Sequence, residues 1–100
     1  MMGLFDGMKK SKEIQKKADW KVGLMPTFVE FHDDYMQLIS TGSTDTIFYK
    51  DIMSVEQTAY LVNIKTNVKT YPLTSRKKRG GTDRAIALQQ QILEKIAEKK

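Results

Sequence analysis

The feature that most constrains the fold is a change in hydrophobic period along the chain. From Trp20 to Leu73, apolar residues largely alternate with polar ones, which is the period of a half-buried β-strand. From about residue 83 to residue 99 they recur at three- and four-residue steps, which is the period of an amphipathic helix. The sequence therefore predicts a mainly β fold with one C-terminal α-helix.

The clearest local signal lies between Thr46 and Gln57. β-branched and aromatic residues favour extended backbone on both sides of the polar pair Lys50-Asp51, so we expect a strand, a sharp corner and a second strand. Six or seven short antiparallel strands in a meander predict an open barrel or sandwich, capped by the terminal helix. The expected strands cover about residues 22–24, 27–31, 35–40, 46–49, 52–57, 60–66 and 68–73.

Four connections carry specific expectations. Residues 32–34, His-Asp-Asp, are expected to form a tight hairpin turn with left-handed backbone at an Asp, and residues 66–67 a second tight turn. Residues 41–45 are expected to be a plain loop. Pro72 has no amide proton, so its strand is expected to lie at an edge of the sheet or to end there.

The C-terminal helix is predicted over about residues 83–99. Thr82 or Asp83 is expected to cap it, and the glutamines at 89–91 are expected to face water. Its apolar stripe comprises Ala85, Leu88, Ile92 and Ile96, with Leu93 beside them.

The positive charge lies at the two ends of the chain. We divide the 100 residues into a basic N-terminal arm, residues 1–20, helical or disordered, and a single domain, residues 21–100. Residues 1–21 carry six lysines against three acids, a net charge of +3. Residues 22–73 carry three bases against six acids, a net −3, and residues 74–100 carry eight bases against three acids, a net +5.

The basic ends supply the candidate binding residues. Four consecutive cations beside two glycines can conform to the phosphates of anionic lipid or nucleic acid, although a solvated loop is the alternative. In the arm, lysines follow Leu4, Phe5 and Met8, which suits either an amphipathic surface anchor or a terminus that docks on the domain. The candidate residues for an anion or a partner are Arg76, Lys77, Lys78, Arg79, Lys9, Lys10 and Lys12.

Several chemistries are not expected. The chain has no cysteine, which excludes disulfides, thiolate catalysis and Cys-ligated metals. His32 beside Asp33 and Asp34 has no second His to complete a metal site, and consecutive side chains in a turn splay apart. No Ser-His pair, glycine-rich phosphate cradle or carboxylate cluster assembles. We expect no enzymatic activity, metal, cofactor or small-molecule substrate.

The expected location is cytoplasmic, with the membrane surface as an alternative. No apolar run approaches the roughly 18–20 residues that a membrane span needs. Asp6, Lys9 and Lys10 interrupt the apolar N-terminus, so no targeting signal is expected.

The order of the elements and one phrase resemble a known family. The phrase is Ile-x-Tyr-x-x-Ile-x-Ser-Val at residues 47–55, and the pattern continues through residues 64–66 and 69–73 into the helix. Over about residues 24–98 the chain resembles the small bacterial pleckstrin-homology-like (PH-like) domains. Related domains that grip phosphoinositides use a basic first hairpin loop, whereas residues 32–34 are acidic here, so phosphate binding at that loop is not expected.

The resemblance implies a binding scaffold without catalysis, and similar bacterial domains often self-associate. We therefore expect a binding or assembly module for a protein or peptide partner, with a homo-oligomer as one form. Its contacts would come from an exposed sheet edge or from a groove beside the helix that accepts an extended peptide. The alternative is electrostatic attachment to anionic lipid or nucleic acid through residues 9–21 and 76–79.

Overall fold

The computed structural model describes residues 16–76 and 79–99. Every strand pairing in these ranges is antiparallel, and one seven-stranded sheet results, with the order β4-β3-β2-β1-β7-β6-β5. The predicted mainly β fold with one C-terminal helix is confirmed. The elements are β1 (Trp20–Val22), β2 (Met25–Phe31), β3 (Tyr35–Ser40), β4 (Ser43–Phe48), the 3-10 turn η1 (Tyr49–Asp51), β5 (Ile52–Thr58), β6 (Leu61–Thr66), β7 (Thr70–Ser75) and α2 (Gly81–Glu98).

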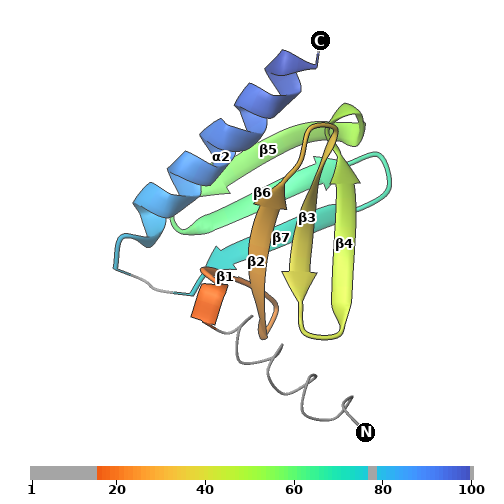
Figure 1. The fold of residues 1–100 in the computed structure, drawn as a ribbon. Helices are drawn as coiled ribbons and strands as arrows, with labels where there is room; N and C mark the ends of the chain where they lie inside the picture. The colour runs from red at the N-terminus through yellow and green to blue at the C-terminus, as the bar shows by residue number, and fades with distance from the viewer. Residues whose placement is uncertain (1–15, 77–78, 100) are drawn as a thin grey trace, which may run out of the picture.

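The sheet curls into a half-barrel, and α2 lies along one side of it (Figure 1). β2, β3 and β4 form one half, and β5, β6 and β7 form the other. The three-residue strand β1 joins the halves, because it pairs with β2 on one side and with β7 on the other. The corner predicted at Lys50-Asp51 is η1, which leads from β4 into β5.

The core lies between the two halves and the helix. Alternate residues of the strands point inward, as the period-two pattern predicts, and the predicted helical stripe meets them. Ile96 packs against this core while partly buried, whereas Leu93 is 46% exposed. The buried core residues are Trp20, Met36, Leu38, Ile47, Tyr49, Val55, Val62, Ile64, Leu73, Ala85, Leu88 and Ile92.

The predicted loop at residues 41–45 is wrong. Only Thr41 and Gly42 form the turn, Gly42 with a φ of 82°, and β4 begins at Ser43. A glycine takes this left-handed backbone without steric cost, so two residues are enough to reverse the chain. β4 is therefore longer than predicted.

Two other predicted turns also differ in detail. Residues 32–34 do connect β2 and β3, but the only non-glycine residue with positive φ in the described ranges is Ala59, so the left-handed Asp is wrong. The turn after β6 extends to Lys69, since the Thr66 hydroxyl accepts hydrogen bonds from the Val68 and Lys69 amides. β7 consequently begins at Thr70.

The expectation that Pro72 marks an edge or a strand end is also wrong, because β7 continues to Ser75 between β1 and β6. The Ser75 amide donates to the Tyr60 carbonyl on the β6 side. Successive backbone amides along a strand point to opposite sides, so the Pro72 nitrogen faces the β1 side. β1 reaches only as far as Thr74, and the missing amide proton of Pro72 therefore breaks no strand pairing.

The predicted cap of α2 is wrong as well. Thr82 and Asp83 lie inside the helix, and Gly80 is the N-cap, with φ 72° and no side-chain capping bond. A Cβ atom added at Gly81 would lie 2.9 Å from Tyr60 Cβ, so only a glycine allows the helix to start this close to the sheet. No helix in the described part of the chain is long and apolar enough to cross a membrane.

Candidate functional site

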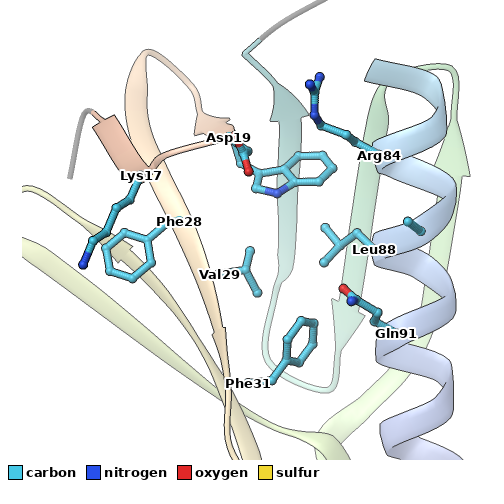
Figure 2. A pocket seen from close by; sticks show the side chains of 10 residues that line it. Lys17, Asp19, Phe28, Val29, Phe31, Arg84, Leu88 and Gln91 are labelled. Atoms are coloured by element: carbon cyan, nitrogen blue, oxygen red, sulfur yellow. The ribbon is translucent and has the colours of Figure 1, made fainter. Parts of the chain in front are cut away.

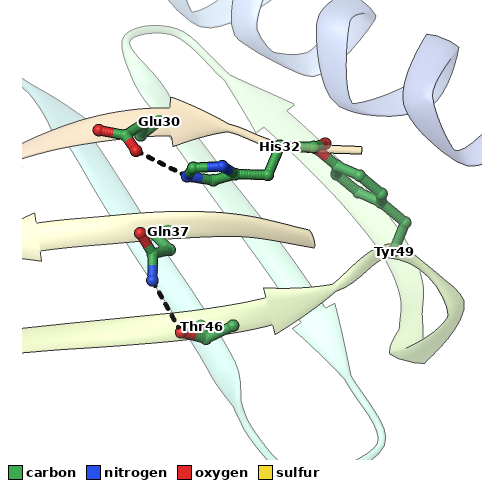
Figure 3. Close-up of polar contacts among 5 residues, drawn as sticks. All are labelled: Glu30, His32, Gln37, Thr46 and Tyr49. Atoms are coloured by element: carbon green, nitrogen blue, oxygen red, sulfur yellow. Dashed lines mark hydrogen bonds and ion pairs between the residues drawn. The ribbon is translucent and has the colours of Figure 1, made fainter. Parts of the chain in front are cut away.

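The free edge of β4 is the first candidate surface. β4 lies at one end of the strand order, and among the described residues it pairs only with β3. Figure 3 shows it as the outermost strand of its half-sheet, where Gln37 of β3 donates to the Thr46 hydroxyl at 3.3 Å. An unpaired edge exposes backbone donors and acceptors to any strand that can align with them.

The alternation of hydrogen-bonded positions along β4 shows which of its residues direct their backbone N–H and C=O groups toward the free edge. The Tyr49 amide donates to the Asp34 carbonyl at 3.2 Å, so position 49 belongs to the hydrogen-bonded pairs with the preceding strand. In an antiparallel pair these positions alternate with positions that direct N–H and C=O away from the neighbour. Thr44, Thr46 and Phe48 therefore present their backbone groups to the free edge.

The side chains along this edge do not block pairing. Natural edge strands are often protected by lysine or proline, and Ser43–Phe48 contains neither. Its one charged residue, Asp45, is partly buried. Threonine and phenylalanine also favour the extended backbone of a strand.

An aromatic row supports the outer face beside β4. The rings of His32 and Tyr35 stack with centroids 4.6 Å apart, and those of Tyr35 and Phe48 lie 5.6 Å apart. Phe48 remains 42% exposed, with the Lys50 ammonium 5.9 Å from its ring centre. This row leaves apolar surface next to the free backbone of the edge.

His32 is held within that row. Its Nε2 lies 2.6 Å from Glu30 Oε1, although the two atoms do not have hydrogen-bond alignment (Figure 3). Its backbone carbonyl accepts a 2.7 Å hydrogen bond from the buried Tyr49 hydroxyl. Groups of three or more potential metal ligands are absent from residues 16–76 and 79–99.

The opposite edge of the sheet, β5, is covered by the helix. α2 packs mainly on β5, with further contacts to β6, β7 and η1. Gln89 Nε2 donates to the Val55 carbonyl at 2.9 Å, so this glutamine does not face water as predicted. A partner strand would have to displace α2 to reach β5 there.

The basic cluster is divided by the structure. The Arg76 amide donates to the Asp19 carbonyl at 2.9 Å, and its Nη1 donates to the Ala18 carbonyl at 3.1 Å. Arg76 therefore fastens the end of the N-terminal arm to the sheet. Arg79 is exposed, and its carbonyl accepts a bond from Arg84. The remaining candidates lie outside the described residues: Lys77, Lys78, Lys9, Lys10 and Lys12.

Two ionisable groups near η1 have shifted pKa values. Burial raises the pKa of the Tyr49 hydroxyl, and Asp33 and Glu98 add to this, while the hydrogen bond to His32 opposes it. The hydrogen bond to Asp34 raises the pKa of Lys99, whose Nζ lies 3.0 Å from Asp34 Oδ1. This ion pair joins the end of α2 to the β2–β3 turn.

Sequence reasoning missed the β4 edge, because Thr44 was placed in a loop. The available signal was the Thr41-Gly42 pair, which can form a two-residue hairpin turn and start the next strand at Ser43. Comparison with protein-family models, curated proteins and solved structures found no match. The PH-like resemblance therefore stays a prediction.

Proposed function

We propose that the protein is a non-catalytic assembly module, and that its partner is a second copy of the same chain. The observation that carries the proposal is the unpaired β4 edge, which presents Thr44, Thr46 and Phe48. A homo-oligomer formed at this edge would join two half-barrels into one continuous sheet. Edge pairing of this kind draws its affinity from backbone hydrogen bonds.

The edge is self-complementary about Thr46. A two-fold axis at Thr46 pairs it with its own copy and pairs Thr44 with Phe48 of the second copy, so all three outward residues form hydrogen bonds. An axis at Asp45 would use only two outward residues and would place two carboxylates opposite each other. An axis at Ile47 would also use only two of the outward residues for hydrogen bonds. We therefore assign the axis to Thr46.

Light scattering of the purified protein tests this arrangement. We expect a dimer for the natural chain and a monomer for Thr46→Lys, because two ammonium groups would face each other across the axis. Thr44→Lys is the matched control, since its ammonium would meet a phenyl ring and the dimer should persist. A natural chain that stays monomeric at about millimolar concentration would contradict the proposal.

A single cysteine supplies a second test, because the chain has none of its own. Hydrogen-bonded residues opposite each other lie about 5.5 Å apart at Cα, which is within the range of a disulfide. Thr46→Cys should therefore form a covalent dimer under mild oxidation. Thr41→Cys, in the exposed turn, should do so on the order of tenfold more slowly. Equal rates would count against the axis at Thr46.

The second candidate function is electrostatic attachment to anionic lipid or nucleic acid, at the membrane surface in the lipid case. The bonds from Arg76 to Ala18 and Asp19 favour it, since they place the end of the basic arm beside the basic loop. Neutralising Lys77, Lys78 and Arg79 with glutamine, while keeping Arg76, should abolish binding to phosphatidylserine vesicles or to DNA at low salt. Unchanged binding would exclude this function for the loop.

A further inference from the structure

A groove of about 330 Å³ lies between α2 and the β1–β2 side of the half-barrel (Figure 2). It arises because α2 packs mainly against β5, on the other side of the sheet, so that among the described residues the facing side of β2 is less closely covered by the helix. In Figure 2 the side chains of Val29 and Phe31 point from β2 toward Leu88 and Gln91 on α2. The lining residues are Lys17, Asp19, Trp20, Phe28, Val29, Phe31, Arg84, Ala87, Leu88 and Gln91.

The floor of the groove is apolar. Trp20 and Leu88 are 7% and 4% exposed, so they form its rigid base. Val29 and Phe31 are only partly buried although they pack against the core. These two side chains retain apolar surface that another apolar side chain can cover.

One wall of the groove also has unpaired backbone. The His32 amide donates to the Tyr35 carbonyl at 2.8 Å, which identifies the hydrogen-bonded positions between β2 and β3. By alternation, Val29 and Phe31 direct N–H and C=O away from β3. β1 could pair with them only if it were longer, but its pairing with β2 stops at Trp20 and Thr27. Within the described ranges no strand pairs with Val29 and Phe31 on the side opposite β3.

The rim carries cations on both sides. Lys17 lies beside Phe28 and Arg84 lies across the groove on α2 (Figure 2), and Arg79 lies next to Arg84, whose guanidinium bonds to the Arg79 carbonyl at 3.1 Å. Asp19 is the one acid among the lining residues. The net charge of this rim favours a ligand that carries carboxylates near one end.

We propose that this groove binds an extended peptide of a partner protein, which pairs with the backbone of Val29 and Phe31. Its alternate apolar side chains cover Phe31 and Leu88, and its acidic residues lie beside Arg84 or, across the groove, beside Lys17. This uses strand addition at an inner gap of the sheet, since the β5 edge is closed by α2. The site is separate from the β4 edge, because β3 lies between β2 and β4.

The probe is a short fluorescein-labelled peptide in which leucine and threonine alternate. Glutamates occupy one end of this peptide. Fluorescence anisotropy should detect binding, and a peptide with lysines in place of the glutamates should bind more weakly. Ala87→Glu should raise the Kd at least about tenfold, because it puts a carboxylate into the groove. Ala97→Glu, at another exposed position of α2, adds the same charge outside the groove and should change little.

Amide hydrogen exchange gives a readout specific to strand addition. With saturating peptide, exchange at Val29 and Phe31 should slow, while Glu30, already bonded to β3, should change little. Absence of binding by both peptides up to about 1 mM would overturn the proposal, as would equal Kd values for Ala87→Glu and Ala97→Glu. Both variants should keep the oligomeric state of the natural chain, so failure here is distinguishable from failure of the β4 pairing.

Discussion

Tyr49 connects two parts of the molecule through one side chain. It is 1% exposed, and its hydroxyl donates to the His32 carbonyl at 2.7 Å, which joins η1 to the end of β2. Tyr49→Phe removes the donor and leaves that carbonyl without its partner. We expect a loss of about 0.5–1.5 kcal/mol in the free energy of unfolding, measured by urea denaturation near neutral pH.

The same side chain predicts an alkaline dependence. Because burial raises the pKa of Tyr49 in the folded state, the folded protein holds this proton more tightly than the unfolded chain does. The resulting stability is complete below the unfolded pKa of about 10 and is lost as pH rises through the folded pKa. The advantage of the natural chain over Tyr49→Phe should therefore shrink above about pH 10. If the difference in unfolding free energy between the two proteins stayed constant through this pH range, the predicted role of the Tyr49 proton would be contradicted.

At the level of single residues, side-chain alternation was sufficient to predict burial but not backbone conformation. Val62, Ile64 and Leu73 are buried as period two requires. The left-handed positions could not be assigned in the same way. Gly80 takes one at the start of α2, where the adjacent Gly81 approaches Tyr60, a residue distant in sequence.

At the level of elements, α2 stabilises the sheet edge that it covers. Gln89 Nε2 supplies a donor to the Val55 carbonyl at 2.9 Å, on the strand that α2 contacts most. Gln89→Ala should lower the free energy of unfolding by about 1 kcal/mol, because that partly buried carbonyl loses its partner. Gln90→Ala, at the exposed neighbouring position, should change it by less than about 0.5 kcal/mol. Equal effects in thermal or urea unfolding would show that the bond does not hold the edge.

The type and order of the elements could be predicted from sequence, whereas the positions of the two proposed binding surfaces could not. The periods of the strands and of α2 each depend on neighbouring residues, so they are visible in the chain. The β4 edge depends on where β4 lies in the sheet, and the groove depends on the direction in which α2 leans. Both are set by tertiary packing, which no local pattern encodes.

At the level of the whole molecule, the half-barrel is held together at a narrow joint. β1 has three residues, and only Trp20 and Lys21 pair with β7. The backbone and side-chain bonds of Arg76 to Asp19 and Ala18 extend this joint beyond the strand. The sequence placed Arg76 with three other cations as a binding residue, although the structure gives it a structural contact.

Arg76 and Arg79 should therefore respond differently to the same substitution. Arg76→Gln removes a charged donor from the Ala18 carbonyl while the backbone bond to Asp19 remains, so we expect a loss of about 1–2 kcal/mol in the free energy of unfolding. Arg79→Gln should change it by less than about 0.5 kcal/mol, because the exposed side chain is replaced while its carbonyl still accepts from Arg84. Trp20, the only tryptophan of the chain, lies at this joint. Its fluorescence can therefore follow the urea unfolding of both variants. Equal midpoints for the two variants would show that the joint does not depend on Arg76.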